Sequence, residues 1–336
     1  MNPMLNIAIR AARKAGNVIA KNYERRDAIE STQKGINDYV TNVDKAAEAE
    51  IIEIIRKSYP DHTIISEETG ALEGKDSDVQ WVIDPLDGTR NFMTGLPHFA
   101  VSIAIRVKNR TEVGVVYDPI RNELFTAVRG EGAKLNEVRL RVDSKREIQG
   151  SILATGFPFK QPKLMPTQFA MMNALIEDAA DFRRTGSAAL DLCYVASNRI
   201  DGYFEMGLKA WDCAAGDLIV REAGGLVCDF DAGNGYLRSG NIIAAPSRVI
   251  KEMLNKIIRQ RESYFRHVHR NEERDDEQEE GVQRKEAEGV WGAPGLCLRK
   301  APQLRGCIPV ESEPESHSGS HSAPSGWEAW PGLGAA

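Results

Sequence analysis

The segment Trp81–Phe92 holds the densest group of residues that could do chemistry. It reads as an apolar strand that ends in Asp84, and Asp87 follows three residues later, directly before Gly88 and Thr89. Two carboxylates at this spacing can converge on one point, and hard divalent cations take such oxygen ligands together with water and phosphate. Gly88 allows close backbone approach, while Thr89, at an expected helix start, offers N–H groups and a hydroxyl to an anion. The segment therefore indicates a metal and phosphate site, although an Asx-type turn with a helix N-cap explains it equally well on its own.

Three further acidic residues stand at the ends of expected elements. Glu67 and Glu68 close a short strand, and Asp212 enters an Ala/Gly-rich helix in the segment Trp211–Gly216. Taken singly, Asp212 is best explained as a helix N-cap and the two glutamates as a solvated turn. Together with the aspartates of the first segment, they favour a built site, because binding residues concentrate in loops at sheet ends.

The first 260 residues offer no other arrangement for hydrolytic chemistry. His62 and His98 are the only histidines there, and neither lies in a nucleophile motif, so we interpret both as structural. Cys213 has no neighbour that would activate it, which favours a small helix residue. The five cysteines of the chain form no CxxC and no metal-like spacing, as expected of a reduced, cytoplasmic protein.

Composition disfavours several classes of protein. Of the 336 residues, 42% are hydrophobic and 27% are charged, which argues against global disorder. The net charge of −6 disfavours direct nucleic-acid binding through the overall field. No apolar run approaches the roughly 20 residues that cross a bilayer, and the N-terminus lacks the apolar core of a signal peptide. We therefore expect a cytoplasmic protein without membrane contact.

Apolar periodicity predicts the elements that must position these acids. Helical spacing from Leu5 to Ile19 predicts an opening amphipathic helix, and a polar loop leads to a second helix that Pro60 stops. Clear helices are also expected at 187–196 and 214–223. Period-two alternation and β-branched runs predict strands at 63–66, 79–83, 101–107, 113–117 and 124–128.

The pattern divides the chain into three parts. We expect an N-terminal α+β half (1–145) with the helix pair, the sheet and the first acidic motif, and a C-terminal α/β half (146–260) with the second motif. From 261 to 336 the sequence is first highly charged and then rich in Pro, Gly and Ser, so we interpret it as a disordered tail. This part holds four of the six histidines, so a metal-binding tail is the alternative.

Asp84–Thr89 (Asp-Pro-Leu-Asp-Gly-Thr) and Trp211–Gly216 (Trp-Asp-Cys-Ala-Ala-Gly) resemble the two signature motifs of the inositol monophosphatase family. Both occur in the family's order, with Glu67–Gly70 before the first, and the resemblance covers residues 3–258. It implies a mixed α+β and α/β fold, the layered αβαβα sandwich of the sugar phosphatases, and a homodimer. Residues 35–44 and 182–191 are most similar to the enterobacterial subgroup, whose members also act in ribosomal RNA transcription antitermination.

The resemblance also implies a magnesium site of two to three ions. Glu67, Asp84 and the backbone carbonyl of Leu86 would hold the first Mg²⁺. Asp84, Asp87 and Asp212 would hold the second, with Asp84 bridging the two ions. A third, weakly held ion would face Glu67.

Other residues match positions that handle water, phosphate and substrate. Thr89, backed by Asp44, would orient and help deprotonate the attacking water, with Glu68 behind the metal ligands. Arg90 departs from the family pattern, either adding charge beside the phosphate or pointing to solvent. Lys34 and Asp38 match positions of a flexible loop near the metal. The positions that match substrate contacts are Asp87, Gly88, Thr89, Gly186, Ser187, Ala188 and Glu205.

The implied activity is Mg²⁺-dependent, Li⁺-sensitive hydrolysis of myo-inositol 1-phosphate and similar polyol phosphates. Phosphate monoesters are among the slowest compounds to hydrolyse uncatalysed, so charge neutralisation and water activation must supply most of the acceleration, and paired metals can do both. Because few residues set specificity in this fold, another small phosphate ester is the alternative: fructose 1,6-bisphosphate, 3′-phosphoadenosine 5′-phosphate or histidinol phosphate.

Arg183 and Arg184 suggest a second kind of function. Two adjacent arginines could contact RNA polymerase or another acidic partner in an antitermination complex. Packing against the second subunit of a dimer explains the pair equally well.

Overall fold

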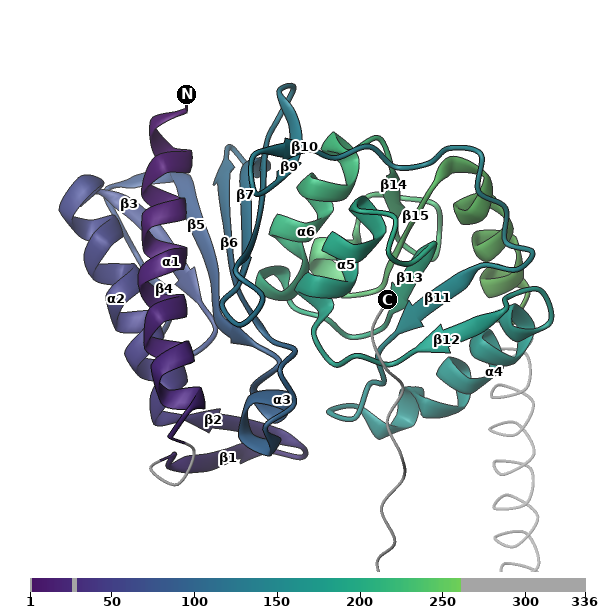
Figure 1. Ribbon diagram of the computed structural model, residues 1–336, viewed down its shortest axis with the longest axis horizontal. Coiled ribbons are helices and arrows are strands. Elements are labelled where there is room, and N and C mark those ends of the chain that lie inside the picture. The colour runs from purple at the N-terminus through teal and green to yellow at the C-terminus, as the bar shows by residue number, and fades with distance from the viewer. Residues whose placement is uncertain (1, 26–28, 261–336) are drawn as a thin grey trace, which may run out of the picture. The chain divides into compact units, whose positions relative to one another are not determined.

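Helices lie on both sides of, and between, two large β-sheets in the computed structural model, which describes residues 2–25 and 29–260 (Figure 1). All of these residues fall in one compact unit. Along the layers the order is helix, sheet, helix, sheet, helix, which confirms the predicted αβαβα sandwich. The expected tail at 261–336, with its histidines, lies outside the described residues.

The first layer is a pair of helices, α1 (Pro3–Tyr23) and α2 (Asn42–Ser58), which pack on each other and on the larger sheet. The Asn2 side chain accepts hydrogen bonds from the backbone N–H groups of Met4 and Leu5 and so caps the start of α1. Thr41 and Asp44 form a capping box at the start of α2. The structure confirms both predicted helices.

The larger sheet has eight strands in the order β10-β9-β8-β7-β6-β5-β3-β4. Its strands pair antiparallel except β3 with β5, which run parallel. The strands predicted between residues 63 and 128 all lie in it, and the apolar residues on one of its faces are buried against α1 and α2. Its strands are β3 (His62–Ser66), β4 (Gly70–Leu72), β5 (Asp76–Asp87), β6 (Ala100–Val107), β7 (Arg110–Asp118), β8 (Glu123–Val128), β9 (Gly132–Leu135) and β10 (Val138–Arg139).

Strand β5 runs through the first acidic motif, whereas the sequence predicted a strand that stops at 83. The pairing of β5 with β6 is irregular between Asp84 and Asp87, so the strand is distorted where the two acids stand. Pro85 cannot donate a ladder hydrogen bond, which suits this irregular stretch. Immediately after it, the short helix α3 (Thr89–Thr94) begins.

The middle layer consists of α5 (Ala188–Ala196) and α6 (Ala210–Glu222), which contact each other and the larger sheet. A Cβ on Gly114 of β7 would lie 2.7 Å from the Ala215 carbonyl oxygen, so α6 and the sheet approach closely there. Helix α6 begins four residues before the predicted start. Asp212 therefore lies in its first turn, where a carboxylate is stabilised by free backbone N–H groups.

The second sheet has five strands in the order β12-β11-β13-β15-β14, parallel in its first three strands. Helix α4 (Met165–Ile176) and a helical segment at 247–260 cover its outer face. The remaining elements are η2 (Pro162–Leu164) and α7 (Tyr236–Ser239), and the strands are β11 (Ile152–Thr155), β12 (Asp181–Arg183), β13 (Gly202–Glu205), β14 (Leu226–Cys228) and β15 (Ile242–Ala245).

A separate hairpin completes the fold. Strands β1 (Ser31–Gly35) and β2 (Asp38–Thr41) form it between α1 and α2 in the chain.

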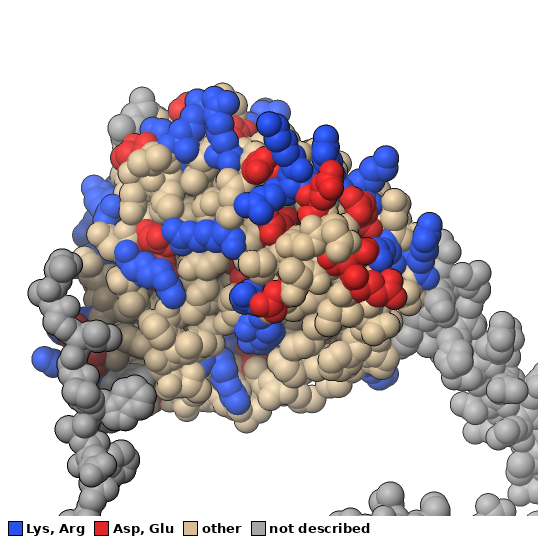
Figure 2. Space-filling model, turned by 45° about the vertical axis from the view of Figure 1, so that its right-hand side comes forward, with Lys and Arg blue, Asp and Glu red and all other residues tan. Residues whose placement is uncertain are grey.

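Among the described helices, none is both long and apolar enough to cross a membrane. On the face shown in Figure 2, basic and acidic side chains intermingle above an area of uncharged side chains. This face therefore presents mixed charge rather than a single sign.

Candidate active site

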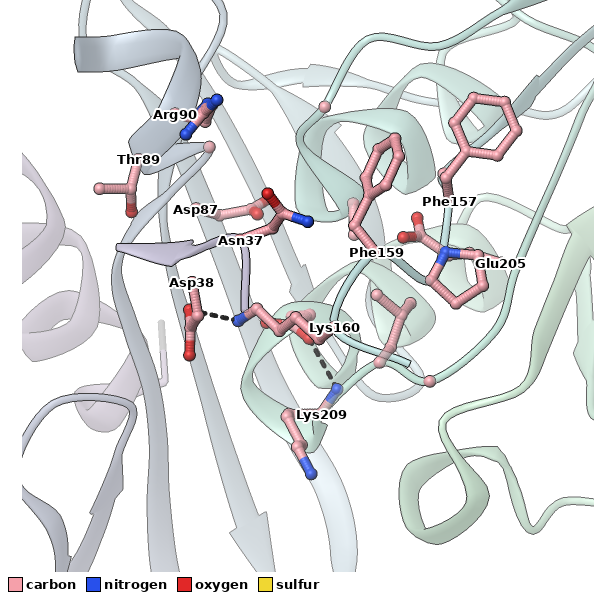
Figure 3. Close-up of a pocket in the computed structure, with 18 of the residues that line it drawn as sticks. Asn37, Asp38, Asp87, Thr89, Arg90, Phe157, Phe159, Lys160, Glu205 and Lys209 are labelled. Atoms are coloured by element: carbon pink, nitrogen blue, oxygen red, sulfur yellow. Dashed lines mark hydrogen bonds and ion pairs between the residues drawn. The ribbon is translucent and has the colours of Figure 1, made fainter. Parts of the chain in front are cut away.

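A cavity of about 420 Å³ opens where the ends of β5 and β13 meet the starts of α3, α5 and α6. The β1–β2 hairpin and the loop 156–161 form its mouth, where Lys160 Nζ lies 2.7 Å from Asp38 Oδ1 (Figure 3). The structure places ten of the predicted site residues on its wall. They are Glu67, Asp84, Leu86, Asp87, Gly88, Thr89, Gly186, Ala188, Glu205 and Asp212.

Asp84 and Asp87 are buried in the irregular end of β5, and their partners differ. Asp84 Oδ1 accepts a hydrogen bond from the Leu86 backbone N–H at 3.0 Å, as in an Asx turn. Asp87 Oδ2 accepts hydrogen bonds from Ser187 Oγ at 2.6 Å and from the Ala189 backbone N–H at 2.8 Å. Asp87 therefore sits at the N-terminus of α5, where free backbone N–H groups stabilise its negative charge.

Three more carboxylates face the cavity from other elements. Glu67 follows β3, and Lys34 Nζ lies 3.7 Å from its Oε1. Asp212 Oδ2 accepts a hydrogen bond from the Lys209 backbone N–H at 2.6 Å. Glu205, at the end of β13, accepts one from the Tyr203 hydroxyl. The cavity thus gathers acids from segments up to 145 residues apart in the chain (Glu67 to Asp212).

Electrostatics in this cavity disfavours the ionised carboxylates. Burial raises the pKa values of Glu67, Asp87 and Asp212 to about 7, and the surrounding carboxylates add to this shift. Burial, followed by the charges of its acidic neighbours, raises the pKa of Asp84 well above its usual value. Burial likewise raises the pKa of Glu205 to about 7. The buried acids of the site therefore resist ionisation, although Lys34 and Lys160 partly offset their charge.

This donor set fits a hard divalent cation in its chemistry. Carboxylate oxygens are the ligands that Mg²⁺ prefers, and a cation among them would favour their ionised forms. In the described part of the chain, however, no three His, Cys, Asp or Glu side chains are already arranged as a ligand cluster. The side chains that would hold the ion by charge and position are Glu67, Asp84, Asp87 and Asp212.

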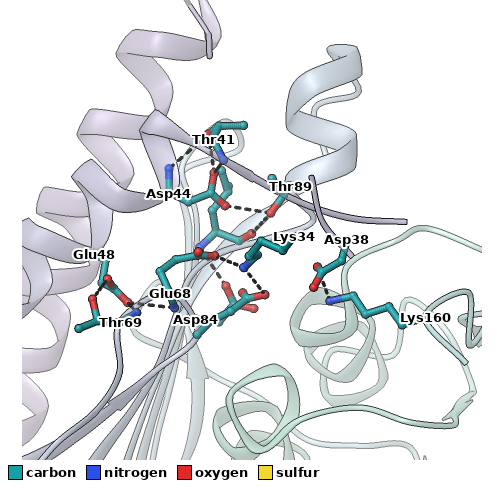
Figure 4. Close-up of polar contacts among 12 residues, drawn as sticks. Lys34, Asp38, Thr41, Asp44, Glu48, Glu68, Thr69, Asp84, Thr89 and Lys160 are labelled. Atoms are coloured by element: carbon teal, nitrogen blue, oxygen red, sulfur yellow. Dashed lines mark hydrogen bonds and ion pairs between the residues drawn. The ribbon is translucent and has the colours of Figure 1, made fainter. Parts of the chain in front are cut away.

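Thr89 has the hydrogen bonds expected of a residue that orients water. Its Oγ1 lies 2.9 Å from Asp44 Oδ1 and 3.0 Å from the Leu86 carbonyl oxygen, both of which are acceptors (Figure 4). Asp44 itself does not line the cavity. Burial raises its pKa, and it also accepts hydrogen bonds from the backbone and side chain of Thr41. Gly88 has φ +94°, and a Cβ there would lie 3.0 Å from the His98 carbonyl oxygen, so glycine is required.

Besides Asp44, two further predicted site residues lie behind the cavity wall. The Ser187 side chain is buried and donates to Asp87 instead of lining the cavity. Glu68 does not line it either, and its Oε1 lies 2.7 Å from Lys34 Nζ. Lys34 and Asp38 do line the cavity, as the resemblance implied. Both Ser187 and Glu68 are thus placed to act through neighbours.

His62, His98 and Cys213 take structural positions outside the cavity. His62 Nδ1 accepts a hydrogen bond from Trp81 Nε1 at 3.0 Å. His98 packs edge-on against Tyr194, and burial lowers its pKa to about 4. Burial raises the pKa of the Cys213 thiol well above its usual value, which removes the thiolate that nucleophilic chemistry would need.

Sequence analysis singled out Arg90 and Arg184, but it missed Lys160 and the aromatic side chains that these arginines contact at the rim of the cavity. Arg90 is exposed, and its guanidinium lies 4.7 Å from the centre of the Tyr39 ring. Arg184 lies 5.5 Å from the centre of the Phe159 ring, and Lys160 comes from the same loop as Phe159. The one signal in the sequence was Gly156-Phe-Pro-Phe-Lys160, an aromatic loop without the periodicity of a strand or helix.

Comparisons with known proteins agree with this geometry. The model of the inositol monophosphatase family matches residues 1–263. The chain is 96% identical over 257 residues to "Nus factor SuhB" of Haemophilus influenzae, a match that covers 76% of this chain and 96% of that protein.

Solved structures share the fold. The "extragenic suppressor protein suhB from Bartonella henselae" superposes with a TM-score of 0.74 at 39% identity, covering 76% of this chain and 98% of that one. "Inositol monophosphate bound SaIMPase-II" has a TM-score of 0.66 at 26% identity, covering 80% of this chain and 99% of that one.

Proposed function

Because the chain belongs to the inositol monophosphatase family, we propose that it hydrolyses myo-inositol 1-phosphate and similar polyol phosphates, with Mg²⁺ as cofactor and with inhibition by Li⁺. The observation that carries this proposal is the cavity in which Glu67, Asp84, Asp87 and Asp212 gather beside the Thr89–Asp44 pair. The related SaIMPase-II structure has inositol monophosphate bound. We also propose that the protein is a homodimer.

Glu67, Asp84, Asp87 and Asp212, with the Leu86 carbonyl, would hold two Mg²⁺ ions, and a third would face Glu67. Bound Mg²⁺ supplies positive charge to the phosphate and lowers the pKa of water. Burial, and then the charges of Glu67, Asp87 and Asp212, raise the pKa of Asp84, so Asp84 lies within electrostatic reach of the other three acids. Asp84 would therefore be the ligand that the two ions share.

Other residues around the cavity would position the attacking water and bind the phosphate and the polyol. Thr89 Oγ1, held by its hydrogen bond to Asp44, would orient the attacking water and accept its proton while the Thr89 hydroxyl proton passes to Asp44. The backbone N–H groups of Gly88 and Thr89 would bind the phosphate. Gly186, Ala188 and Glu205 also line the cavity, where they would contact the polyol hydroxyl groups.

The test is phosphate release from myo-inositol 1-phosphate with Mg²⁺, with and without Li⁺. Asp84→Asn, which keeps the shape of the side chain and removes its charge, should abolish turnover. Fructose 1,6-bisphosphate, 3′-phosphoadenosine 5′-phosphate and histidinol phosphate are tested in parallel. A higher kcat/KM for one of these three would replace the substrate in the proposal, and activity that persists in Asp84→Asn would contradict the metal site.

A second function is favoured by the 96% identity to a protein named Nus factor. We propose that the chain also acts as a transcription antitermination factor and contacts RNA polymerase or its accessory proteins through Arg183 and Arg184. Arg183 lies on β12 and pairs with Asp181 at 2.5 Å, whereas Arg184 also lines the cavity. Both functions would place the protein in the cytoplasm.

A pull-down of transcription elongation complexes tests this second function. Arg183→Ala and Arg184→Ala should each reduce capture, and only Arg184→Ala should also alter phosphatase kinetics. Analytical ultracentrifugation of both variants shows whether dimer packing explains the arginine pair instead. Equal capture of the wild type and both variants would remove this surface from the proposal.

A further inference from the structure

Helix α2 presents two buried acids, Asp44 and Glu48, one helical turn apart. Residues at this spacing share a face of a helix. The relative exposures of Asp44 and Glu48 are 1% and 4%, so both side chains make their contacts inside the protein. Asp44 contacts Thr89 at the start of α3, and Glu48 contacts the turn after β3 (Figure 4).

The Glu48 carboxylate binds the turn between β3 and β4. Its Oε1 accepts hydrogen bonds from the backbone N–H groups of Glu68 at 3.2 Å and Thr69 at 3.1 Å. Its Oε2 accepts one from the Thr69 hydroxyl. Both carboxylate oxygens are therefore engaged by three donors of one short turn, and charge-assisted hydrogen bonds of this kind are stronger than neutral ones.

This turn carries Glu67, and it is supported from two sides. On one side, the Glu67 backbone N–H donates to the Ile83 carbonyl oxygen of β5 at 3.1 Å, one residue before Asp84. On the other side, Glu48 holds the two residues that follow Glu67. The position of the Glu67 side chain relative to Asp84 therefore depends on both supports.

We propose that Glu48 is a positioning residue that fixes the Glu67–Thr69 turn for cation binding. Through Asp44 and Glu48, helix α2 thus contacts both the start of α3, which carries Thr89, and the turn that carries Glu67. Glu48 does not line the cavity, so it acts through Glu67 rather than on the ion or the substrate. The inference rests on the proposed function, because it assigns Glu48 to the same metal site.

The experiment counts bound metal directly instead of turnover. Mn²⁺ alone is titrated into the full-length protein, and free Mn²⁺ is followed by electron paramagnetic resonance. Glu48→Ala should weaken the tightest apparent dissociation constant by about 10-fold or more, since partners behind metal ligands typically contribute 10–100-fold. Glu48→Gln should stay within about 3-fold of the wild type, because an amide carbonyl can still accept both backbone hydrogen bonds.

Glu53→Ala is the matched control. Glu53 lies on the same helix and is exposed. Within the described residues, its one ion pair is with Lys57 on that helix. The Glu53→Ala variant should bind Mn²⁺ with the same affinity as the wild type. Circular dichroism checks that each variant is folded, and Glu48→Asp, one methylene shorter, replaces Glu48→Ala if the latter does not fold.

The possible outcomes separate the inference from the proposed function. Wild-type affinity in Glu48→Ala or Glu48→Asp overturns the role of Glu48 and leaves the metal-dependent phosphatase intact. Loss of affinity in Glu48→Gln as large as in Glu48→Ala would also overturn it, because charge rather than position would then matter. A wild type that binds no Mn²⁺ removes the metal site, and the inference with it.

Discussion

Ser187 and Asp87 are 100 residues apart in the chain, and the Ser187 hydroxyl donates a 2.6 Å hydrogen bond to the Asp87 carboxylate. Ser187 is also the N-cap of α5, since its Oγ accepts a hydrogen bond from the Leu190 backbone N–H. One hydroxyl thus joins the start of a helix to a candidate metal ligand. This relationship changes the role expected for Ser187 from contacting substrate to holding Asp87.

Ser187→Ala should therefore lower kcat rather than raise KM for myo-inositol 1-phosphate. Burial raises the pKa of Asp87 to about 7, and the hydrogen bonds from Ser187 and Ala189 lower it, so losing one of them should raise this pKa further. The acidic limb of the pH–rate profile should then move to higher pH. Ser187→Thr, which keeps the hydroxyl, is the control, and a rise in KM alone in Ser187→Ala would support direct substrate contact instead.

Asp44→Asn should reduce kcat by about 100-fold or more, a typical contribution of a positioned proton acceptor. The change leaves Thr89 without its charged partner, so Thr89→Val should have a similar effect. The double variant should be no slower than either single variant, because the two residues act as a unit. Steady-state kinetics at saturating Mg²⁺ measures all three.

Loss of a helix cap is the competing explanation for Asp44→Asn, since Asp44 also belongs to the capping box of α2. Asn2→Ala removes the cap of α1 and should cost about 1 kcal/mol of unfolding free energy. Because Asn2 does not line the cavity, the kcat of Asn2→Ala should equal that of the wild type. Equal losses of kcat in the two variants would show that stability, not proton transfer, underlies the effect.

Without metal, the protein should become less stable as pH rises through about 7. The folded-state pKa values of Glu67, Asp87 and Asp212 are raised to about 7, above their values in an unfolded chain. The folded state therefore binds more protons than the unfolded state between these values, and stability is lost as those protons leave. Mg²⁺ favours the ionised forms, so it should stabilise the protein more at pH 8 than at pH 5.5.

Thermal unfolding in EDTA and in Mg²⁺ at these two pH values measures the effect. The rise in Tm on adding Mg²⁺ should be larger at pH 8 by about 3 °C or more, a change on the order of 1 kcal/mol for a domain of this size. Asp84→Asn should remove most of the difference. The same Mg²⁺ effect at both pH values would mean that these carboxylates are not the ligands.

Local patterns were sufficient to predict most of the elements and the acids at their ends. The apolar period along α1 and the alternation in β6 and β7 follow from burying one face, which a sequence records directly. Asp84 and Asp212 could be found because each lies in a short motif at the end of an element. The β5 strand ran further than predicted because its distorted end is paired with β6, a long-range contact.

The residues that were missed act through the tertiary fold. Glu48 occupies one of several acidic positions on α2, and nothing in the sequence distinguishes it from exposed Glu53 on the same helix. Lys160 and Phe159 come from an irregular loop that only the packing of the second sheet brings to the cavity. The direction in which Ser187 points was likewise decided by Asp87, which precedes it by 100 residues.

Gly156→Ala should raise KM for myo-inositol 1-phosphate by displacing Glu205. A Cβ on Gly156 would lie 2.0 Å from Glu205 Oε1, so the carboxylate must move, and its hydrogen bond with Tyr203 must change with it. We expect KM to rise by about 10-fold, which corresponds to one misplaced hydrogen-bonding group at about 1.4 kcal/mol. The Mn²⁺ affinity should stay within about 3-fold of the wild type, because Glu205 is not among the proposed metal ligands.

Glu205→Gln provides the comparison, since it keeps the shape and removes the charge. If Glu205 binds the polyol, the double variant Gly156→Ala/Glu205→Gln should have a KM no higher than the worse single variant, because both changes affect one contact. Gly150→Ala controls for backbone strain: Gly150 has φ +74° with open space around it, so alanine there should cost about 1 kcal/mol of stability and leave KM unchanged. Wild-type KM in folded Gly156→Ala would show that the Glu205 carboxylate does not set substrate affinity, and the polyol would then have to be held by Gly186 and Ala188 alone.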